Sequence, residues 1–87
     1  MVSKNVIVTN PSGIHARPAG VLSKIAKECT SEIILVKGEK RVKAKSVMSI
    51  LTAAITSGSE ITVECEGPDE VKDLETIVNA IESGLGE

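Results

Sequence analysis

Four short stretches of the chain have the pattern of β-strands, with apolar, often β-branched, residues in alternation or in short runs. They cover residues 2–9, 32–37, 40–44 and 61–66. In the last of them Ile61, Val63 and Cys65 alternate with polar residues, which predicts one buried and one solvent-facing side. Only Gly38 and Glu39 separate the two middle stretches, so we expect these to form an antiparallel hairpin.

Three further stretches carry apolar residues every three or four positions, the period of an amphipathic helix. The first covers residues 16–28, and its stripe consists of Ala19, Val21, Leu22, Ile25, Ala26 and Cys29. The second begins after Ser46 and ends at the turn-forming residues 56–59, and its stripe consists of Val47, Ile50, Leu51 and Ala54. The third begins after Asp69, a suitable helix cap, and its stripe consists of Val71, Leu74, Ile77, Val78, Ile81 and Leu85.

The order of these elements is β-α-β-β-α-β-α, which predicts one α+β domain spanning residues 1–87. Short connections between strands favour a four-stranded, mainly antiparallel sheet. We expect the three helices to cover one face of this sheet, which is the architecture of an open-faced β-sandwich.

Composition narrows the choice of partners. The chain is 41% hydrophobic but has no Phe, Tyr or Trp, so aliphatic residues must form its core and no aromatic platform exists for stacking on nucleic-acid bases. Its net charge is -2, which gives no electrostatic attraction to nucleic acid or to an anionic membrane. Residues 1–10 lack the apolar core of a secretion signal, and no stretch is long enough to span a bilayer. We therefore expect a cytoplasmic protein without membrane insertion.

The two cysteines, Cys29 and Cys65, do not have the spacing of a metal-binding or redox pair. We interpret both as buried free thiols, since a disulfide is disfavoured in a reducing compartment. With a single histidine in the chain, we expect neither a metal site nor a cofactor.

Residues 12–19, which join the first strand to the first helix, carry the chemistry. His15 lies where the helix N-cap is expected, although Ala16 or Arg17 can share that role because Pro18 disfavours helical angles in the residue before it. The first amides of a helix have no intrahelical partner, and the helix dipole adds partial positive charge, so this end suits an anion. The predicted phosphate-binding loop comprises Ser12, Gly13 and Ala16.

His15 and Arg17 together suit phosphoryl transfer. An imidazole nitrogen keeps a lone pair near neutral pH and forms a labile, high-energy bond to phosphorus. The guanidinium of Arg17, two residues later, can pair with phosphate oxygens through several N–H donors. Taken by spacing alone, a histidine before a helix is more often a cap or a surface residue, and both interpretations stay open at this point.

The motif Gly13-Ile14-His15-Ala16-Arg17-Pro18-Ala19 resembles the active-site signature of HPr, the phosphocarrier family of the bacterial sugar phosphotransferase system. Residues 43–51 resemble the regulatory segment of the same family. The turns at 58–61 and 66–70 also resemble family segments, so the resemblance extends over nearly the whole chain in the right order.

This resemblance implies that His15 accepts a phosphoryl group from enzyme I and passes it to the IIA components of sugar permeases. It implies a monomeric carrier that is not itself an enzyme, with Arg17 stabilising the phosphate. It also implies that an HPr kinase/phosphorylase phosphorylates Ser46, and that the protein has a catabolite-control transcription regulator as a further partner. A member of the nitrogen branch of the family is an open alternative.

Two further expectations concern the regulatory segment. The spacing predicts Ser46 as a helix N-cap, where an added phosphate favours the helix. The resemblance implies that Val47, Met48 and Leu51 form an apolar docking patch, and Met48 lies off the core stripe of its helix. We expect Val47 and Leu51 to be shared between core and patch.

Two other classes of protein compete with the carrier. One is a small acylphosphatase-like hydrolase, which also uses an arginine in a phosphate-binding loop on a compact α+β domain. The other is a ligand-binding regulatory module of ferredoxin-like shape, in which no covalent phosphate forms. His15 beside Arg17, with no second acid or base in the loop, favours the carrier.

Overall fold

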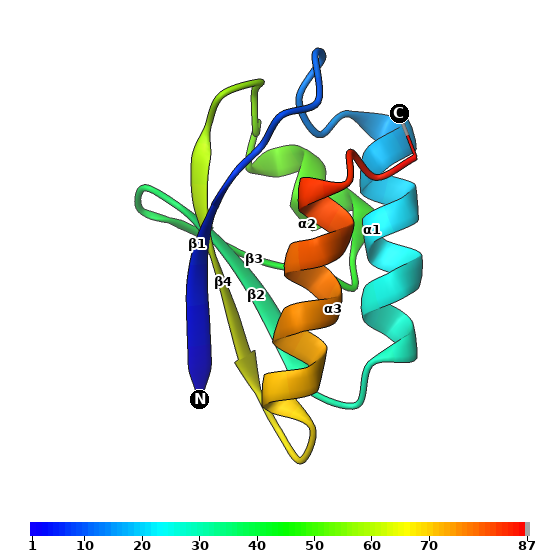
Figure 1. Ribbon diagram of the computed structural model, residues 1–87. Helices are drawn as coiled ribbons and strands as arrows, with labels where there is room; N and C mark the ends of the chain where they lie inside the picture. Colours follow the sequence, from blue (N-terminus) through cyan, green and yellow to red (C-terminus); the bar gives the residue numbers. More distant parts are fainter. Residues whose placement is uncertain (87) are drawn as a thin grey trace.

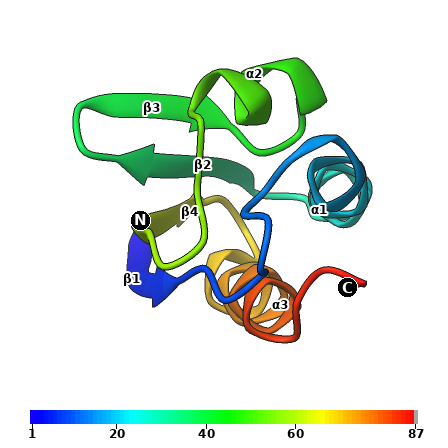
Figure 2. The same ribbon diagram turned by 90° about the horizontal axis from the view of Figure 1, so that it is seen from above.

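The computed structural model describes residues 1–86 and has the element order expected from the sequence (Figure 1). Its strands are β1 (Val2–Ile7), β2 (Glu32–Lys37), β3 (Lys40–Lys43) and β4 (Glu60–Glu66). Its helices are α1 (Ala16–Glu28), α2 (Val47–Thr52) and α3 (Glu70–Glu82). The strands form one sheet, and all three helices lie on the same side of it (Figure 2). The predicted open-faced β-sandwich is confirmed.

The sheet has the strand order β1-β4-β2-β3, and every neighbouring pair is antiparallel. The hairpin β2–β3 pairs Leu35 with Val42, and the register of β2 and β4 pairs Leu35 with Val63. These three side chains therefore share one row on the side that faces the helices.

The core lies between this side of the sheet and the helices. Alternation explains which side chains enter it: in β1 Val6 is buried, while its neighbour Ile7 is exposed on the open side. α1 packs between α2 and α3, and α3 covers β1 and β4. The largest buried aliphatic side chains are Leu22, Ile33, Leu35, Ile50, Ile61, Ile77 and Ile81.

The end of α2 differs from the prediction. The helix ends at Thr52, well before residues 56–59. Ala54, a residue of the predicted apolar stripe, is exposed, and its neighbour Ala53 is buried instead. Ala54 has a φ of 51°, a left-handed conformation that ends the helix. Lysines of the β2–β3 hairpin satisfy the freed carbonyls: Lys37 Nζ donates to Ala54 O at 2.6 Å, and Lys40 Nζ donates to Thr52 O at 3.1 Å.

The predicted stripe of α3 is wrong at its start. Val71 is 60% exposed, whereas Asp73 is only 6% exposed. Asp73 faces inward because its carboxylate accepts a hydrogen bond from the backbone amide of Ser31 at 3.0 Å, at the turn that leads into β2. Asp69 occupies the N-cap position without a side-chain capping bond, and its carboxylate accepts from the Thr30 hydroxyl at 3.1 Å.

Acid should weaken the fold through Asp73. The nearby side chain of Ser31, together with the hydrogen bond from its backbone amide, holds the pKa of this carboxyl below its ordinary value of 3.8, against the opposing effect of desolvation. The contribution to stability is therefore present above the ordinary pKa and is lost as the pH falls through the lower, folded-state pKa. We expect Asp73→Asn to lower the free energy of unfolding by about 1–3 kcal/mol at pH 7, and by less below pH 3.8.

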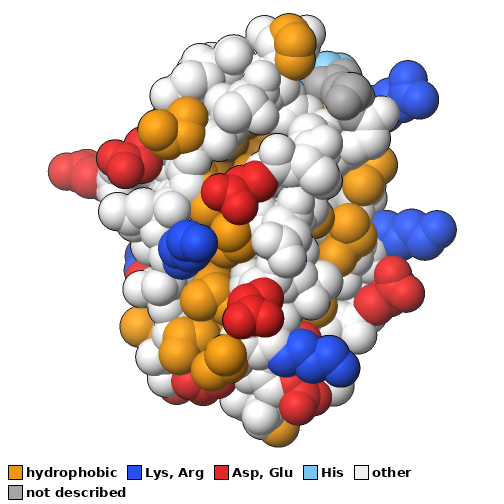
Figure 3. Space-filling model, viewed as in Figure 1, with side chains coloured by type: hydrophobic (Ala, Val, Ile, Leu, Met, Phe, Trp, Pro, Cys, Tyr) orange, Lys and Arg blue, Asp and Glu red, His pale blue; other side chains and the backbone are white. Residues whose placement is uncertain are grey.

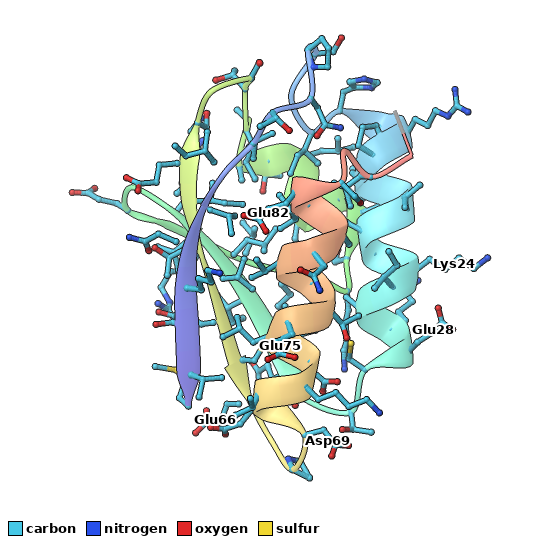
Figure 4. All side chains as sticks on the ribbon, viewed as in Figure 1. Lys24, Glu28, Glu66, Asp69, Glu75 and Glu82 are labelled. Carbon is cyan, nitrogen blue, oxygen red and sulfur yellow. The ribbon has the colours of Figure 1, made fainter. Side chains whose placement is uncertain are left out.

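Urea unfolding at both pH values measures this difference. Glu75→Gln is the matched control, because Glu75 is an exposed acidic residue on the same helix (Figure 4). A loss for Asp73→Asn that is the same at both pH values would show that the effect is steric and not due to the charge.

The cysteine prediction is confirmed in part. Both thiols are free, and Cys65 is buried, but Cys29 is only half-buried at the end of α1. Burial raises the pKa of the Cys65 thiol to about 11 and is also the main cause of the raised pKa of Cys29, where Asp73 adds to the effect. Both thiols are thus protonated and weakly nucleophilic at neutral pH.

Candidate functional site

The loop between β1 and α1 is a tight turn held against the rest of the domain. Gly13 N donates to Asn10 O at 2.9 Å, closing a turn with Pro11 at its second position. The next amide, that of Ile14, donates to Ile55 O at 3.0 Å, so the loop is attached to the segment that follows α2. The side chain of Ile14 is buried, and the chain then enters α1.

Gly13 cannot be replaced without disturbing this attachment. Its φ is +71°, and a Cβ there would lie 2.4 Å from Ile55 O and 2.8 Å from Thr56 Cα. Both atoms belong to the backbone and cannot rotate away. Two independent causes, the backbone conformation and the close approach of residues 55–56, therefore require glycine at this position.

We expect Gly13→Ala to lower the free energy of unfolding by about 1–3 kcal/mol. Gly20→Ala is the control with the opposite sign, because a Cβ at Gly20 meets nothing within 4 Å and alanine favours the interior of α1 by up to about 1 kcal/mol. Thermal or urea unfolding measures both variants. Equal stability of the Gly13→Ala and parent proteins would show that the loop can move away from residues 55–56.

His15 is the N-cap of α1, as expected, with φ -94° and ψ -163°. Its carbonyl accepts the first helical bond, from Ala19 N at 2.9 Å. Pro18 is buried in the first turn and has no N–H. Only the amides of Ala16 and Arg17 thus remain without an acceptor inside the helix, and both belong to residues next to the imidazole.

The chemical groups at this end face solvent. The side chains of Ser12, His15, Ala16 and Arg17 are all exposed. The predicted loop is therefore accessible from solution, and its residues carry an imidazole, a guanidinium and two helix-end amides. Such a set of groups matches a phosphoryl group, which needs donors around three oxygens.

Ser46 is the N-cap of α2, as predicted. Its hydroxyl accepts a hydrogen bond from Ser49 N at 3.2 Å. The preceding residue is tied to α1, because the buried Ser23 hydroxyl donates to Lys45 O at 2.8 Å. Ser46 therefore lies on a segment that is fixed against α1.

The expected docking patch is exposed to different degrees. Met48 is 71% exposed, whereas Val47 and Leu51 are half-buried against the core, so the expected sharing between core and surface agrees with their burial. α2 begins beside the middle of α1, at the bond between Ser23 and Lys45, and the chain after it reaches the His15 loop at Ile55. The patch therefore belongs to the same region of the molecule as His15.

Sequence reasoning missed several residues that hold this loop. Ile55 and Thr56 form its floor, and the buried Asn10 anchors its start. A pattern of apolar positions cannot reveal backbone acceptors such as Ile55 O. Asn10 lies in a run of turn-forming residues, which are usually exposed, so its burial could not be predicted from the sequence.

The surface carries no large patch of one charge on the face shown in Figure 3, where acidic and basic side chains are interspersed over the helices. Among residues 1–86 no group of three or more His, Cys, Asp and Glu side chains is arranged to hold a metal ion. No helix in the described part of the chain is long and apolar enough to cross a membrane.

Comparison with known families and proteins agrees with the geometry of the loop. Residues 2–83 match the family model described as the PTS HPr component phosphorylation site. The chain is 46% identical over 77 residues to the phosphocarrier protein HPr of Treponema pallidum, covering 88% of each protein. It is 44% identical over 82 residues to the HPr-like protein Crh of Halalkalibacterium halodurans, covering 94% of this chain and 98% of Crh.

Solved structures show the same fold. HPr from Thermoanaerobacter tengcongensis has a TM-score of 0.95 and 34% identity, covering 100% of this chain and 98% of that one. The fold and the loop thus define a phosphocarrier of the phosphotransferase system. The chain belongs to the HPr family.

Proposed function

We propose that this protein carries phosphoryl groups on His15, accepting them from enzyme I and delivering them to the IIA components of sugar permeases. The observation that carries the proposal is the position of the chain's single histidine, exposed at the start of α1 beside Arg17 and two amides without an intrahelical acceptor. Membership of the HPr family supports the choice of partners.

In the proposed step, a lone pair of an imidazole nitrogen forms a bond to phosphorus while the bond between phosphorus and enzyme I breaks. The departing electron pair stays with the donor. Bond formation leaves one positive charge on the imidazole ring, which is neutralised when the other ring nitrogen releases its proton to solvent. Negative charge spreads over the three phosphoryl oxygens during transfer. The guanidinium of Arg17 and the amides of Ala16 and Arg17 are the donors that stabilise it.

A carrier differs from a hydrolase in its stoichiometry. Protein charged by enzyme I and phosphoenolpyruvate should hold one phosphoryl group, lose it when a IIA domain is added, and leave that domain phosphorylated. Incubation with acetyl phosphate separates the two classes, because a carrier should not turn it over. Continuous release of inorganic phosphate would instead support the acylphosphatase-like class.

Regulation at Ser46 forms the second part of the proposal, with an HPr kinase/phosphorylase as the modifying enzyme and a catabolite-control transcription regulator as a further partner. The relatives of this chain include Crh proteins, which supports a role of the chain in carbon catabolite regulation. Two negative charges at Ser46 would meet the favourable end of α2 and leave the helix intact. They would also lie beside Val47 and Met48, where they oppose apolar docking.

We expect Ser46→Asp to keep the melting temperature of the parent, because aspartate is also a good N-cap, and to raise the protein concentration needed for half-maximal transfer from enzyme I. Ser46→Ala should do the reverse, with stability lower by about 1 kcal/mol and transfer unchanged. Thermal unfolding and transfer kinetics measure both. Early melting of Ser46→Asp, or normal transfer at low concentration, would contradict the docking mechanism.

We also propose that the carrier acts as a cytoplasmic monomer. All four strands pair within one chain, and the apolar residues of the helices, apart from the exposed Met48 and Val71, pack into or against its own core. The same surface around His15 then remains available to each of several partners in turn.

A further inference from the structure

Asn10 is unusual among the residues at the start of the loop because its side chain is buried. Asparagine is common at the first position of a turn followed by proline, where it normally faces solvent. Here Asn10 is only 2% exposed, and its Nδ2 donates to Gly84 O at 2.7 Å. This bond joins residues 74 positions apart in the sequence.

The acceptor belongs to a firmly built helix end. α3 ends with the two bonds of a Schellman motif, from Gly84 N to Ile81 O and from Leu85 N to Ala80 O, both 3.1 Å. Gly84 has a φ of 93°, which suits its position after the cap residue. The side chain of Leu85 is buried in the core, so the Gly84 carbonyl has a fixed position.

From this anchor a short chain of contacts leads to His15. The Asn10 carbonyl accepts a hydrogen bond from the amide of Gly13, and Gly13 lies against the backbone of residues 55–56. Ile14 then donates to Ile55 O, and the next residue is His15. Figures 1 and 2 both show this segment passing the end of α3 before it enters α1. The loop is thus held at its start by α3 and at its end by the segment after α2.

We propose that Asn10 is a positioning residue for phosphoryl transfer, because it fixes the start of the loop that places His15 at the end of α1. The inference rests on the proposed function of His15. Without the Asn10 side chain, the Gly84 carbonyl loses its donor, and the turn from Asn10 to Gly13 can move relative to α3. His15 would then sample positions away from the two helix-end amides and Arg17.

The test compares Asn10→Ala with Ser83→Ala. The Ser83 hydroxyl donates to Ala80 O at 2.9 Å, so the control removes a side-chain hydrogen bond from the same helix end without touching the loop. Amide hydrogen exchange is measured at Ile14 and at Val63, which lies in the central strand β4. Kinetics of phosphorylation by enzyme I are measured in parallel.

For Asn10→Ala we expect exchange at Ile14 to accelerate about tenfold relative to Val63, because the loop opens locally while the sheet stays closed. We also expect kcat for phosphorylation to fall about fivefold with KM unchanged, since docking does not involve this buried residue. Ser83→Ala should change neither quantity. If Asn10→Ala does not fold, Asn10→Leu keeps the branched shape of the side chain, removes the donor without burying a charge and should give the same pattern.

Equal acceleration at Ile14 and Val63 would mean that Asn10 supports only global stability, and would overturn the inference. Unchanged exchange at Ile14, or an effect confined to KM, would overturn it as well. Failure of the proposed function is a separate result: the parent protein would then take no phosphoryl group from enzyme I, whatever the exchange rates show.

Discussion

A protein with His15→Ala will take up no phosphoryl group from enzyme I and phosphoenolpyruvate. His15 is the only histidine in the chain, so no second imidazole can replace it. Both free thiols are kept protonated by raised pKa values, which makes them poor substitutes as nucleophiles. The loss should be complete, which makes this the largest effect that any single substitution is expected to have.

The fold should survive this change, because the His15 side chain is exposed and its removal leaves the core contacts of Ile14 and Pro18 in place. Circular dichroism and a melting curve provide that control. Phosphate on the folded variant would show that another residue is the acceptor, and would remove the basis of the proposed mechanism.

Replacing Arg17 by alanine should slow transfer strongly and leave stability almost unchanged. Arg17 is exposed at the second position of α1, so its guanidinium contributes little to the core. We expect the guanidinium to stabilise the negative charge that develops on the phosphoryl oxygens during transfer. The loss of one such donor costs about 2–4 kcal/mol in activation free energy, which corresponds to roughly 30- to 1,000-fold in rate.

Lys72→Ala is a control that makes the same change in net charge. Lys72 is an exposed residue near the start of α3, at the end of the molecule opposite to the His15 loop (Figure 1). Arg17→Lys tests geometry, because it keeps the charge but loses the planar set of donors, and it should recover only part of the rate. Stopped-flow kinetics measure the rate of phosphorylation of the parent and of all three variants. An equal rate for Arg17→Ala and the parent would make Arg17 an ordinary solvated charge.

The elements of this fold were predictable from the sequence because apolar residues recur with periods that differ for strands and helices. The bounds of α1 and β2 agree with the prediction, and the short Gly38-Glu39 connection indicates the antiparallel hairpin. Prediction failed where a tertiary contact decides the outcome. Val71 is exposed and Asp73 buried because the amide of Ser31 requires an acceptor, and that amide lies far away in the sequence.

The site was predictable to a similar extent. The position of His15 at a helix N-terminus follows from the turn and the helical stripe around it, and the resemblance to HPr selected phosphoryl transfer among the possible uses of such a site. The supports of the loop could not be foreseen. The carbonyls of Ile55 and Gly84 are backbone groups, and only the folded chain brings them to Ile14 and Asn10.

The most direct test of the account is the intact mass of the parent protein after incubation with enzyme I and phosphoenolpyruvate. We predict a gain of one phosphoryl group, its complete loss after brief treatment with acid, and no gain when enzyme I is omitted. Acid lability excludes a phosphate ester of serine or threonine, and the chain offers only one imidazole to form a phosphorus–nitrogen bond. An unchanged mass, or a phosphate that resists acid, would contradict the assignment of His15 as the phosphoryl carrier.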